Sequence, residues 1–138
     1  MRIMGIDYGS KRIGIAMSDE LFLTAQGFDT ILNRTSAESI EAIKRLVMEN
    51  AVKEVVVGLP ISMNGTHSQK TKEVAEFTEE LSRALSVPVR NIDERLTTVQ
   101  AERALLDGDM SRGKRRQLRD KIAAQFILQS YLDSQRKG

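Results

Sequence analysis

Three acidic positions lie where a carboxylate could do chemistry. Asp7 ends the apolar run RIMGID, Asp93 and Glu94 follow the run VPVRNI, and Asp120 opens the stretch DKIAAQFILQSYL. Carboxylates that gather in one place repel each other and need cations. Oxygen ligands without cysteine or a histidine pair favour Mg²⁺ or Mn²⁺ over zinc. Two such ions about 4 Å apart can stabilise the attacking and leaving oxygens of a phosphodiester.

Each acid also has a purely structural explanation. Asp7 could form an Asx turn, and the acidic pair after VPVRNI could be no more than a loop charge. Asp120 could interact with the positive end of a helix dipole or form an ion pair. Its possible partners nearby in the sequence are Arg115, Arg116 and Arg119. Taken together, three acids at one end of one sheet favour a metal site.

Basic residues gather just before Asp120. Residues 112–121, RGKRRQLRDK, contain six basic side chains and one acid, a formal charge of +5. The whole chain carries only +2, so the other residues sum to −3. A basic cluster on a near-neutral body indicates a polyanion such as nucleic acid, although a solvated helix start would look the same.

Four cationic residues are candidate phosphate contacts. Lys11 and Arg12 follow Asp7 directly, and Arg115 and Arg116 belong to the basic cluster. A surface charge is the plain alternative for each. The single histidine, His67, precedes a predicted helix, where backbone N–H groups can receive a phosphate. It could equally be an ordinary first-turn residue, so its role stays open.

Length and composition limit the class of protein. The 138 residues suffice for one domain, which we expect to span residues 1–138. No apolar run approaches the ~20 residues of a membrane span, and the N-terminus lacks the shape of a signal peptide. With no cysteine, disulfides and thiolate metal sites are excluded. We therefore expect a cytoplasmic protein without a membrane partner, and the oligomeric state stays open.

The hydrophobic pattern predicts the elements that position these residues. Strands are expected at residues 2–7, 12–18, 21–32, 54–60 and 87–93. Helices are expected at 36–50, 67–85, 98–108 and 118–134, with a polar loop or short helix over 107–116. Thr66 with Gln69, and Thr97 with Gln100, fit capping boxes. Gly27 fits a β-bulge.

This order of elements predicts an α/β fold. Three successive strands form an antiparallel meander, and the strand–helix alternation that follows gives βαβ crossovers, so one mixed five-stranded sheet is flanked by helices. Ligands bind at the carboxyl ends of strands in such sheets. In the last helix, Asp120 shares a face with an apolar stripe at helical spacing, and two alanines would let that helix approach the sheet closely. The stripe is Ala123, Ala124, Ile127, Leu128 and Tyr131.

Four stretches together resemble one family. GIDYGSKRIGIA, VVVGLPISMNGT, DERLTT and DKIAAQFILQSYL occur in the order and spacing of the YqgF family, also called RuvX, over essentially the whole chain. The family is described as Holliday junction resolvase-like and as a proposed nuclease for the end of pre-16S rRNA. The resemblance implies an RNase H-like fold and a phosphodiesterase site that depends on Mg²⁺ or Mn²⁺.

The resemblance also implies the site residues. The matching acids are Asp7, Glu94 and Asp120, as catalytic residues and metal ligands. One departure concerns the fourth strand, EVVVGLP, which ends without the acid that resolvases of the RuvC type have there. Glu94 would have to supply that charge from the fifth strand.

The implied function is hydrolysis of phosphodiester bonds in nucleic acid, with processing of the 5′ end of pre-16S rRNA as the first choice. A resolvase-type DNA endonuclease and a non-catalytic RNA-binding module are the alternatives. An ATPase of the actin and sugar-kinase type shares the D-x-G-S/T pattern of residues 7–10. Such enzymes enclose their nucleotide between two domains of this kind, and this chain is long enough for one.

Overall fold

The computed structural model describes residues 1–60, 68–94 and 112–137, with side chains omitted at 112–118 and 137. The strands are β1 (Arg2–Tyr8), β2 (Arg12–Ser18), β3 (Ala25–Leu32), β4 (Val52–Leu59) and β5 (Val89–Asp93). The helices are α1 (Ser36–Glu49), α2 (Gln69–Ala84) and α4 (Arg112–Lys137).

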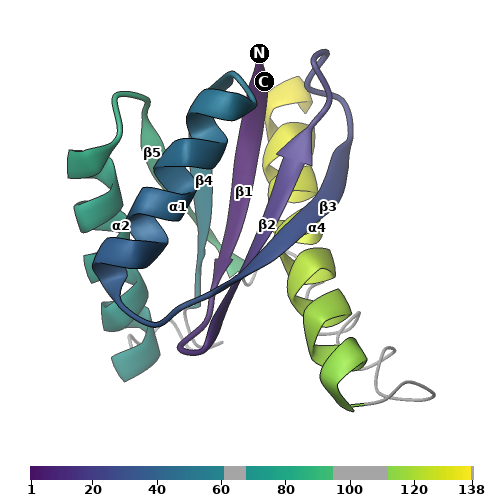
Figure 1. Cartoon of the computed structure of the whole chain (residues 1–138). Helices are drawn as coiled ribbons and strands as arrows, with labels where there is room; N and C mark the ends of the chain where they lie inside the picture. The colour runs from purple at the N-terminus through teal and green to yellow at the C-terminus, as the bar shows by residue number, and fades with distance from the viewer. Residues whose placement is uncertain (61–67, 95–111, 138) are drawn as a thin grey trace.

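The strands form one mixed sheet in the order β3-β2-β1-β4-β5 (Figure 1). β2 is antiparallel to β1 and β3, whereas β1, β4 and β5 are parallel. This confirms the predicted five-stranded sheet. The carboxyl ends of β1, β4 and β5 consequently lie at one edge, where the predicted site should form.

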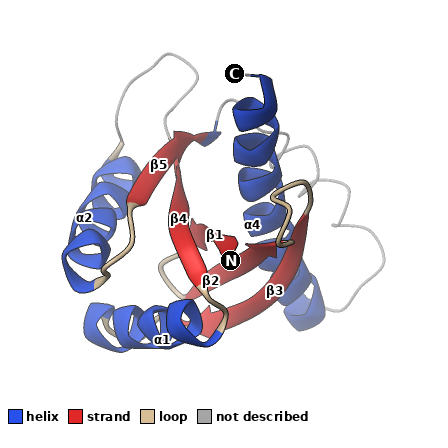
Figure 2. Cartoon of the chain, turned by 90° about the horizontal axis from the view of Figure 1, so that it is seen from above, coloured by secondary structure: helices blue, strands red, loops and turns tan. Residues whose placement is uncertain are grey.

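Helices cover both faces of the sheet. α1 and α2 lie on one face and α4 lies on the other (Figure 2). Because side chains alternate along a strand, Met4 and Ile6 of β1 join the core under α1 and α2, while Ile3 joins the core under α4. The same alternation directs Asp7 to the α4 face.

α4 lies very close to the sheet. A Cβ added at Gly5 of β1 would lie 2.7 Å from the Cβ of Leu128 and 3.0 Å from the backbone oxygen of Ala124. At Gly14 of β2, it would lie 2.1 Å from the backbone oxygen of Asp120. Ala123 and Ala124 are fully buried, so the predicted close approach is confirmed. Only glycine leaves room for the helix at these strand positions.

Two predicted element starts are wrong. α4 begins at Arg112, so residues 112–116 belong to this long helix and not to a separate loop or short helix before it. Lysine, arginine and glutamine are good helix formers, so this stretch can be helical although it is strongly basic. β3 begins at Ala25, because the Asp19 carboxylate accepts bonds from the backbone N–H groups of Leu23 and Thr24 and closes a turn instead. The bond from Thr24 is the main reason that the pKa of Asp19 is lowered.

The predicted details of β3 and α2 fare differently. Pairing of Ile15 with Asp29 is followed by pairing of Ala16 with Gly27, so the predicted bulge at Gly27 is confirmed. The predicted capping box of Thr66 with Gln69 is wrong: the N-cap of α2 is Ser68, and its box partner is Thr71. The helix predicted at 98–108 and its cap at Thr97 lie outside the described residues.

Within the described residues, no helix combines the length and apolar character that crossing a membrane requires.

Candidate active site

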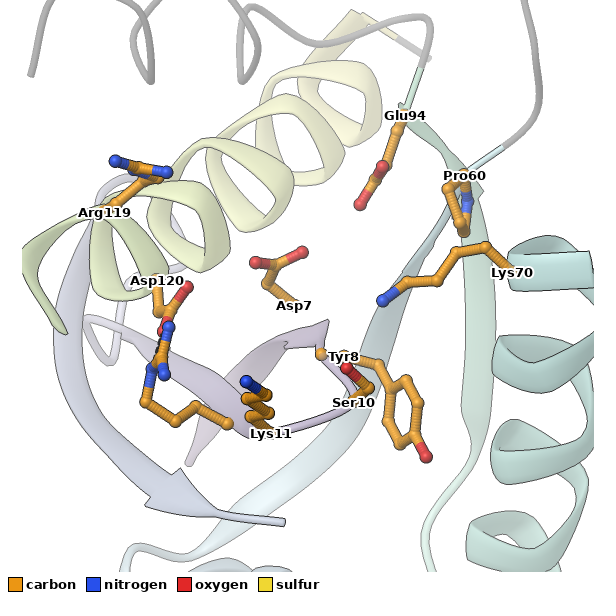
Figure 3. A pocket seen from close by; sticks show the side chains of 11 residues that line it. Asp7, Tyr8, Ser10, Lys11, Pro60, Lys70, Glu94, Arg119 and Asp120 are labelled. Atoms are coloured by element: carbon orange, nitrogen blue, oxygen red, sulfur yellow. Dashed lines mark hydrogen bonds and ion pairs between the residues drawn. The ribbon is translucent and has the colours of Figure 1, made fainter. Parts of the chain in front are cut away.

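The three predicted acids line one pocket. It has a volume of about 450 Å³ and lies where β1 and β5 end (Figure 3). Asp7, Glu94 and Asp120 come from β1, from the residue after β5 and from α4, and their carboxylates face the same space (Figure 3). The fold therefore brings together three acids that are far apart in the sequence, as we predicted.

Asp7 and Asp120 meet because of the glycine that pairs with Asp7. Asp7 is buried, with only 8% of its surface exposed, and pairs with Gly14 in the register of β1 and β2. Gly14 is also the position over which the backbone of Asp120 lies. A side chain at this position of β2 would separate the two acids, so Gly14 is what allows α4 to bring Asp120 next to Asp7.

Glu94 approaches Asp7 from the other side in a similar way. Ile6 of β1 pairs with Val57 of β4. The residues that follow this pair are Asp7 in β1 and Gly58 in β4. A Cβ added at Gly58 would lie 2.8 Å from Oε1 of Glu94. The Glu94 side chain thus occupies the space of the missing β4 side chain. This is the arrangement expected if Glu94 supplies the charge that β4 lacks.

Asp120 has an ion-pair partner that the sequence did not suggest. Nε of Arg12 donates to Oδ2 of Asp120 at 2.9 Å, and both side chains are mostly buried. Arg119 lines the same pocket, whereas the side chains of Arg115 and Arg116 lie outside the described part of the chain. A guanidinium has five N–H donors, so Arg12 can fix Asp120 and still contact a phosphate. Its role as a phosphate contact stays a prediction.

The remaining cations of the pocket are Lys11 and Lys70. Lys11 was predicted, but Lys70, in the first turn of α2, was not. Its position just after a strand–helix loop could have suggested it, because such helix starts lie at the ligand-binding edge. For Arg119, the sequence predicted only a possible ion pair with Asp120. His67 lies outside the described residues, so its role stays open.

The charges of the pocket suit a phosphate and a hard cation together. Among the described residues, four cationic and three acidic side chains line it, and their formal charges sum to +1. Carboxylate oxygens are the ligands that Mg²⁺ and Mn²⁺ prefer. The three acids of the pocket therefore fit such an ion. In the described part of the chain no three acidic or histidine side chains are already close enough to share one ion.

The family model described as "RuvX: Holliday junction resolvase" matches residues 1–134. A curated protein of Halothermothrix orenii is 47% identical over 137 residues, which cover 99% of this chain and 98% of that protein. A protein of Caldanaerobacter subterraneus subsp. tengcongensis is 50% identical over 139 residues, which cover 100% of each. Both are named "Putative pre-16S rRNA nuclease".

Two solved structures share the fold at low sequence identity. T. thermophilus RuvC in complex with a Holliday junction substrate has a TM-score of 0.60 and 12% identity, covering 99% of this chain and 96% of that chain. Fowlpox virus resolvase with Holliday junction DNA has a TM-score of 0.59 and 12% identity, covering 98% and 99%. These likenesses confirm the predicted RNase H-like fold.

Proposed function

Because the chain belongs to the RuvX family, we propose that it is a nuclease that hydrolyses phosphodiester bonds, with Asp7, Glu94 and Asp120 as its catalytic acids. One observation carries this proposal: in the described part of the chain, three acids that are distant in the sequence line a single pocket together with four cationic side chains. The carboxylates would hold a metal ion that assists hydrolysis, and the cationic side chains would bind the phosphates of the substrate.

Asp7, Glu94 and Asp120 would hold Mg²⁺ or Mn²⁺. When bound, such ions stabilise the charge that develops on the oxygens of the reacting phosphate. The rest of the task falls to the chain itself. Asp7 is the central and most buried acid, and the other two flank it over Gly14 and Gly58. The ion pair with Arg12 orients Asp120.

The cationic residues would guide the strand to these acids. Lys11 and Arg119 line the pocket on the side of Asp120 (Figure 3), and Arg12 forms an ion pair with Asp120. Arg115 and Arg116 stand near the start of α4, the helix that carries Asp120, and would contact phosphates further along the strand. Contacts of this kind bind nucleic acid without reading its sequence.

RNA is the substrate we propose first, specifically the 5′ end of pre-16S rRNA, with the protein acting in the cytoplasm. The names of the two curated relatives support this choice. A four-way DNA junction is the second candidate, since the family description names Holliday junction resolution. The chemistry at phosphorus would be the same for both.

Cleavage of labelled precursor rRNA and of a four-way DNA junction tests this proposal. Each substrate is incubated with Mg²⁺, Mn²⁺ or EDTA. We expect metal-dependent cleavage that Asp7→Asn lowers by at least about 10²-fold, because one charged ligand of the site is lost. The matched control is Glu41→Gln, which neutralises an exposed acid of α1. Circular dichroism and thermal unfolding check that each variant is folded.

Full cleavage by the Asp7→Asn protein would contradict the assignment of the acids. Binding of RNA without cleavage by the wild-type protein, with or without metal, would favour the non-catalytic RNA-binding module instead.

A further inference from the structure

Lys70 enters the pocket from the side opposite to Asp120 (Figure 3). It lies in the first turn of α2, and its side chain extends toward Asp7 (Figure 3). Arg119 and Asp120 of α4 stand on the other side of Asp7 (Figure 3), and Arg12 of β2 is bonded to Asp120. The pocket therefore has cations on two sides, and Lys70 is the described cation on the side of Pro60 and Glu94.

The backbone on both sides of Lys70 is held firmly. Ser68 caps α2 and forms a capping box with Thr71, so the residues two before and one after Lys70 are bonded to each other. Thr71 is buried and its hydroxyl donates to the backbone oxygen of Pro60, just beyond the end of β4. These bonds fix the start of α2 to the same sheet edge that carries Asp7, so the base of the Lys70 side chain has a defined position relative to the acids.

The lysine side chain is directed by an aromatic pair. Its Nζ lies 5.8 Å from the centre of the Tyr8 ring, within the range of a cation–π contact. The Tyr8 ring in turn packs against Phe77 of α2, with ring centres 4.4 Å apart. Tyr8 follows Asp7 in the chain, so the ring that supports the ammonium is tied to the central acid.

The ammonium of Lys70 is not committed to a carboxylate. Across the part of the chain that the structure describes, it forms no hydrogen bond and no ion pair, and it contacts the Tyr8 ring. Arg12, by contrast, donates to Asp120. An ammonium has three N–H donors, and none of the described carboxylates occupies those of Lys70.

We propose that Lys70 is a catalytic residue whose ammonium binds a non-bridging oxygen of the scissile phosphate. This inference rests on the proposed nuclease function. In the hydrolysis, the oxygen of a water molecule forms a bond to phosphorus, and the bond from phosphorus to the leaving oxygen breaks. The water gives up a proton and the leaving oxygen gains one, so one strand ends in a phosphate and the other in a hydroxyl.

Lys70 keeps its proton throughout and acts by charge. Negative charge on the phosphate oxygens is redistributed as the new bond forms, and a fixed cation in a partly buried pocket stabilises that change more than water does. Arg12 and Arg119 would serve the same phosphate from the opposite side. An ammonium is a point charge that needs no bidentate geometry, which suits a single oxygen atom.

The test compares Lys70→Met with Lys72→Met. Both substitutions remove a lysine of the first turn of α2, but Lys72 is exposed and does not line the pocket. With the metal that supports cleavage, we expect Lys70→Met to lower kcat/KM by about 10²-fold, mostly in kcat, because the interaction strengthens in the transition state. Lys72→Met should stay within about twofold of the wild type. Lys70→Arg should restore part of the rate, since it restores the charge.

The outcomes separate the two proposals. If the wild-type protein cleaves and Lys70→Met cleaves as fast as Lys72→Met, the role of Lys70 is overturned and the nuclease function stands. If the wild-type protein cleaves neither substrate, the nuclease function falls and the role of Lys70 falls with it. Thermal unfolding is measured for each variant, and Lys70→Gln replaces Lys70→Met if the latter is unfolded. A loss that Lys70→Arg does not repair at all would also overturn a role based on charge.

Discussion

Asp120 combines two interactions in one carboxylate. Its Oδ2 accepts a bond from Arg12, and the proposed function requires the same side chain to hold a cation. The ion pair keeps the carboxylate directed into the pocket, where an uncompensated charge beside Asp7 and Glu94 would be costly. A bound cation would then share Asp120 with Arg12, using the second carboxylate oxygen or replacing the bond. Arg12 is therefore a positioning residue for Asp120 as well as a candidate phosphate contact.

Tyr131 shows how a single partly buried group outside the lining of the pocket responds to pH. Its hydroxyl donates to Glu54 at 2.7 Å, and Glu54 also accepts a bond from Arg90. Burial, followed by the bond to Glu54, raises the pKa of Tyr131 from 10.0 to about 12. Because the pKa is higher in the folded state, this group stabilises the fold fully below pH 10 and loses that contribution as the pH rises to about 12.

We therefore expect Tyr131→Phe to lower the free energy of unfolding by about 1 kcal/mol at neutral pH, since it removes one hydrogen bond to a charged group. The difference between wild type and variant should shrink between pH 10 and about 12. Urea unfolding of both proteins across this range measures it. Tyr8→Phe, which leaves the bond to Glu54 in place, is the control. A difference that stays constant up to pH 12 would contradict the explanation.

Individual residues of the site were predictable to different degrees. Asp7 and Asp120 stand at junctions between an apolar run and a polar stretch, a signal that a sequence displays directly. The bond between Arg12 and Asp120 joins residues 108 positions apart and depends on how α4 crosses β2. Lys70 looks like an ordinary helix lysine, and its place in the pocket follows from the bond between Thr71 and Pro60. Contacts of this kind are set by tertiary packing and have no local sequence pattern.

Among the elements, the two strands on either side of β1 each have a glycine where an acid from another element lies. Gly14 of β2 lies under Asp120, and Gly58 of β4 lies under Glu94. Both strands flank β1, which carries Asp7. The two glycines leave the space in which these acids lie, and this space sets how far the acids are from Asp7. The glycines therefore belong to the site, although they offer no functional group.

Gly14→Ala tests this role. The new Cβ would lie 2.1 Å from the backbone oxygen of Asp120, so α4 would have to move and carry Asp120 with it. We expect a loss of stability of about 1–3 kcal/mol or more and a large loss of cleavage. Gly27→Ala is the control, because its nearest contact, the Cβ of Lys121, would be 3.1 Å away and the same helix is involved. Urea unfolding and cleavage rates are measured for both, and equal effects would contradict the proposal.

The elements themselves were largely predictable. Alternating apolar residues and short connections indicated the antiparallel strands, and continuous apolar runs such as VVVGLP indicated parallel ones buried on both faces. The start of α4 was missed because its first residues are polar and basic, so hydrophobic periodicity gives no signal there. The start of β3 was missed because the turn at Asp19 contains Leu21, Phe22 and Leu23, which look like strand residues.

At the scale of the whole molecule, charge is local. The chain carries only +2, whereas the basic stretch 112–121 alone carries +5. The described side chains of the pocket sum to +1 although three of them are acids. A nucleic acid would therefore be attracted to one edge of the sheet and the start of α4 rather than to the surface in general. Such attraction weakens with salt, because binding releases counterions from the phosphates.

Salt dependence of binding measures how many of these contacts form. In the Asp7→Asn background, where cleavage is prevented, we expect the logarithm of the RNA affinity to fall linearly with the logarithm of salt concentration. Lys11→Gln should reduce the slope by about 1, since one phosphate contact is lost. Lys44→Gln, on the exposed face of α1, should leave it unchanged. Equal slopes for both variants would exclude Lys11 from the binding surface.

The order of the three acids along the chain has a consequence for biosynthesis. Translation produces Asp7 in the first strand early, and Asp120 only with α4, the last described helix. Until α4 is made, the pocket lacks Asp120 and Arg119, and the apolar sheet face around Ile3 and Ala16 has no cover. A chain that does not yet include α4 therefore cannot carry the assembled site. A nuclease built in this way would be unable to cut RNA before α4 has been synthesised.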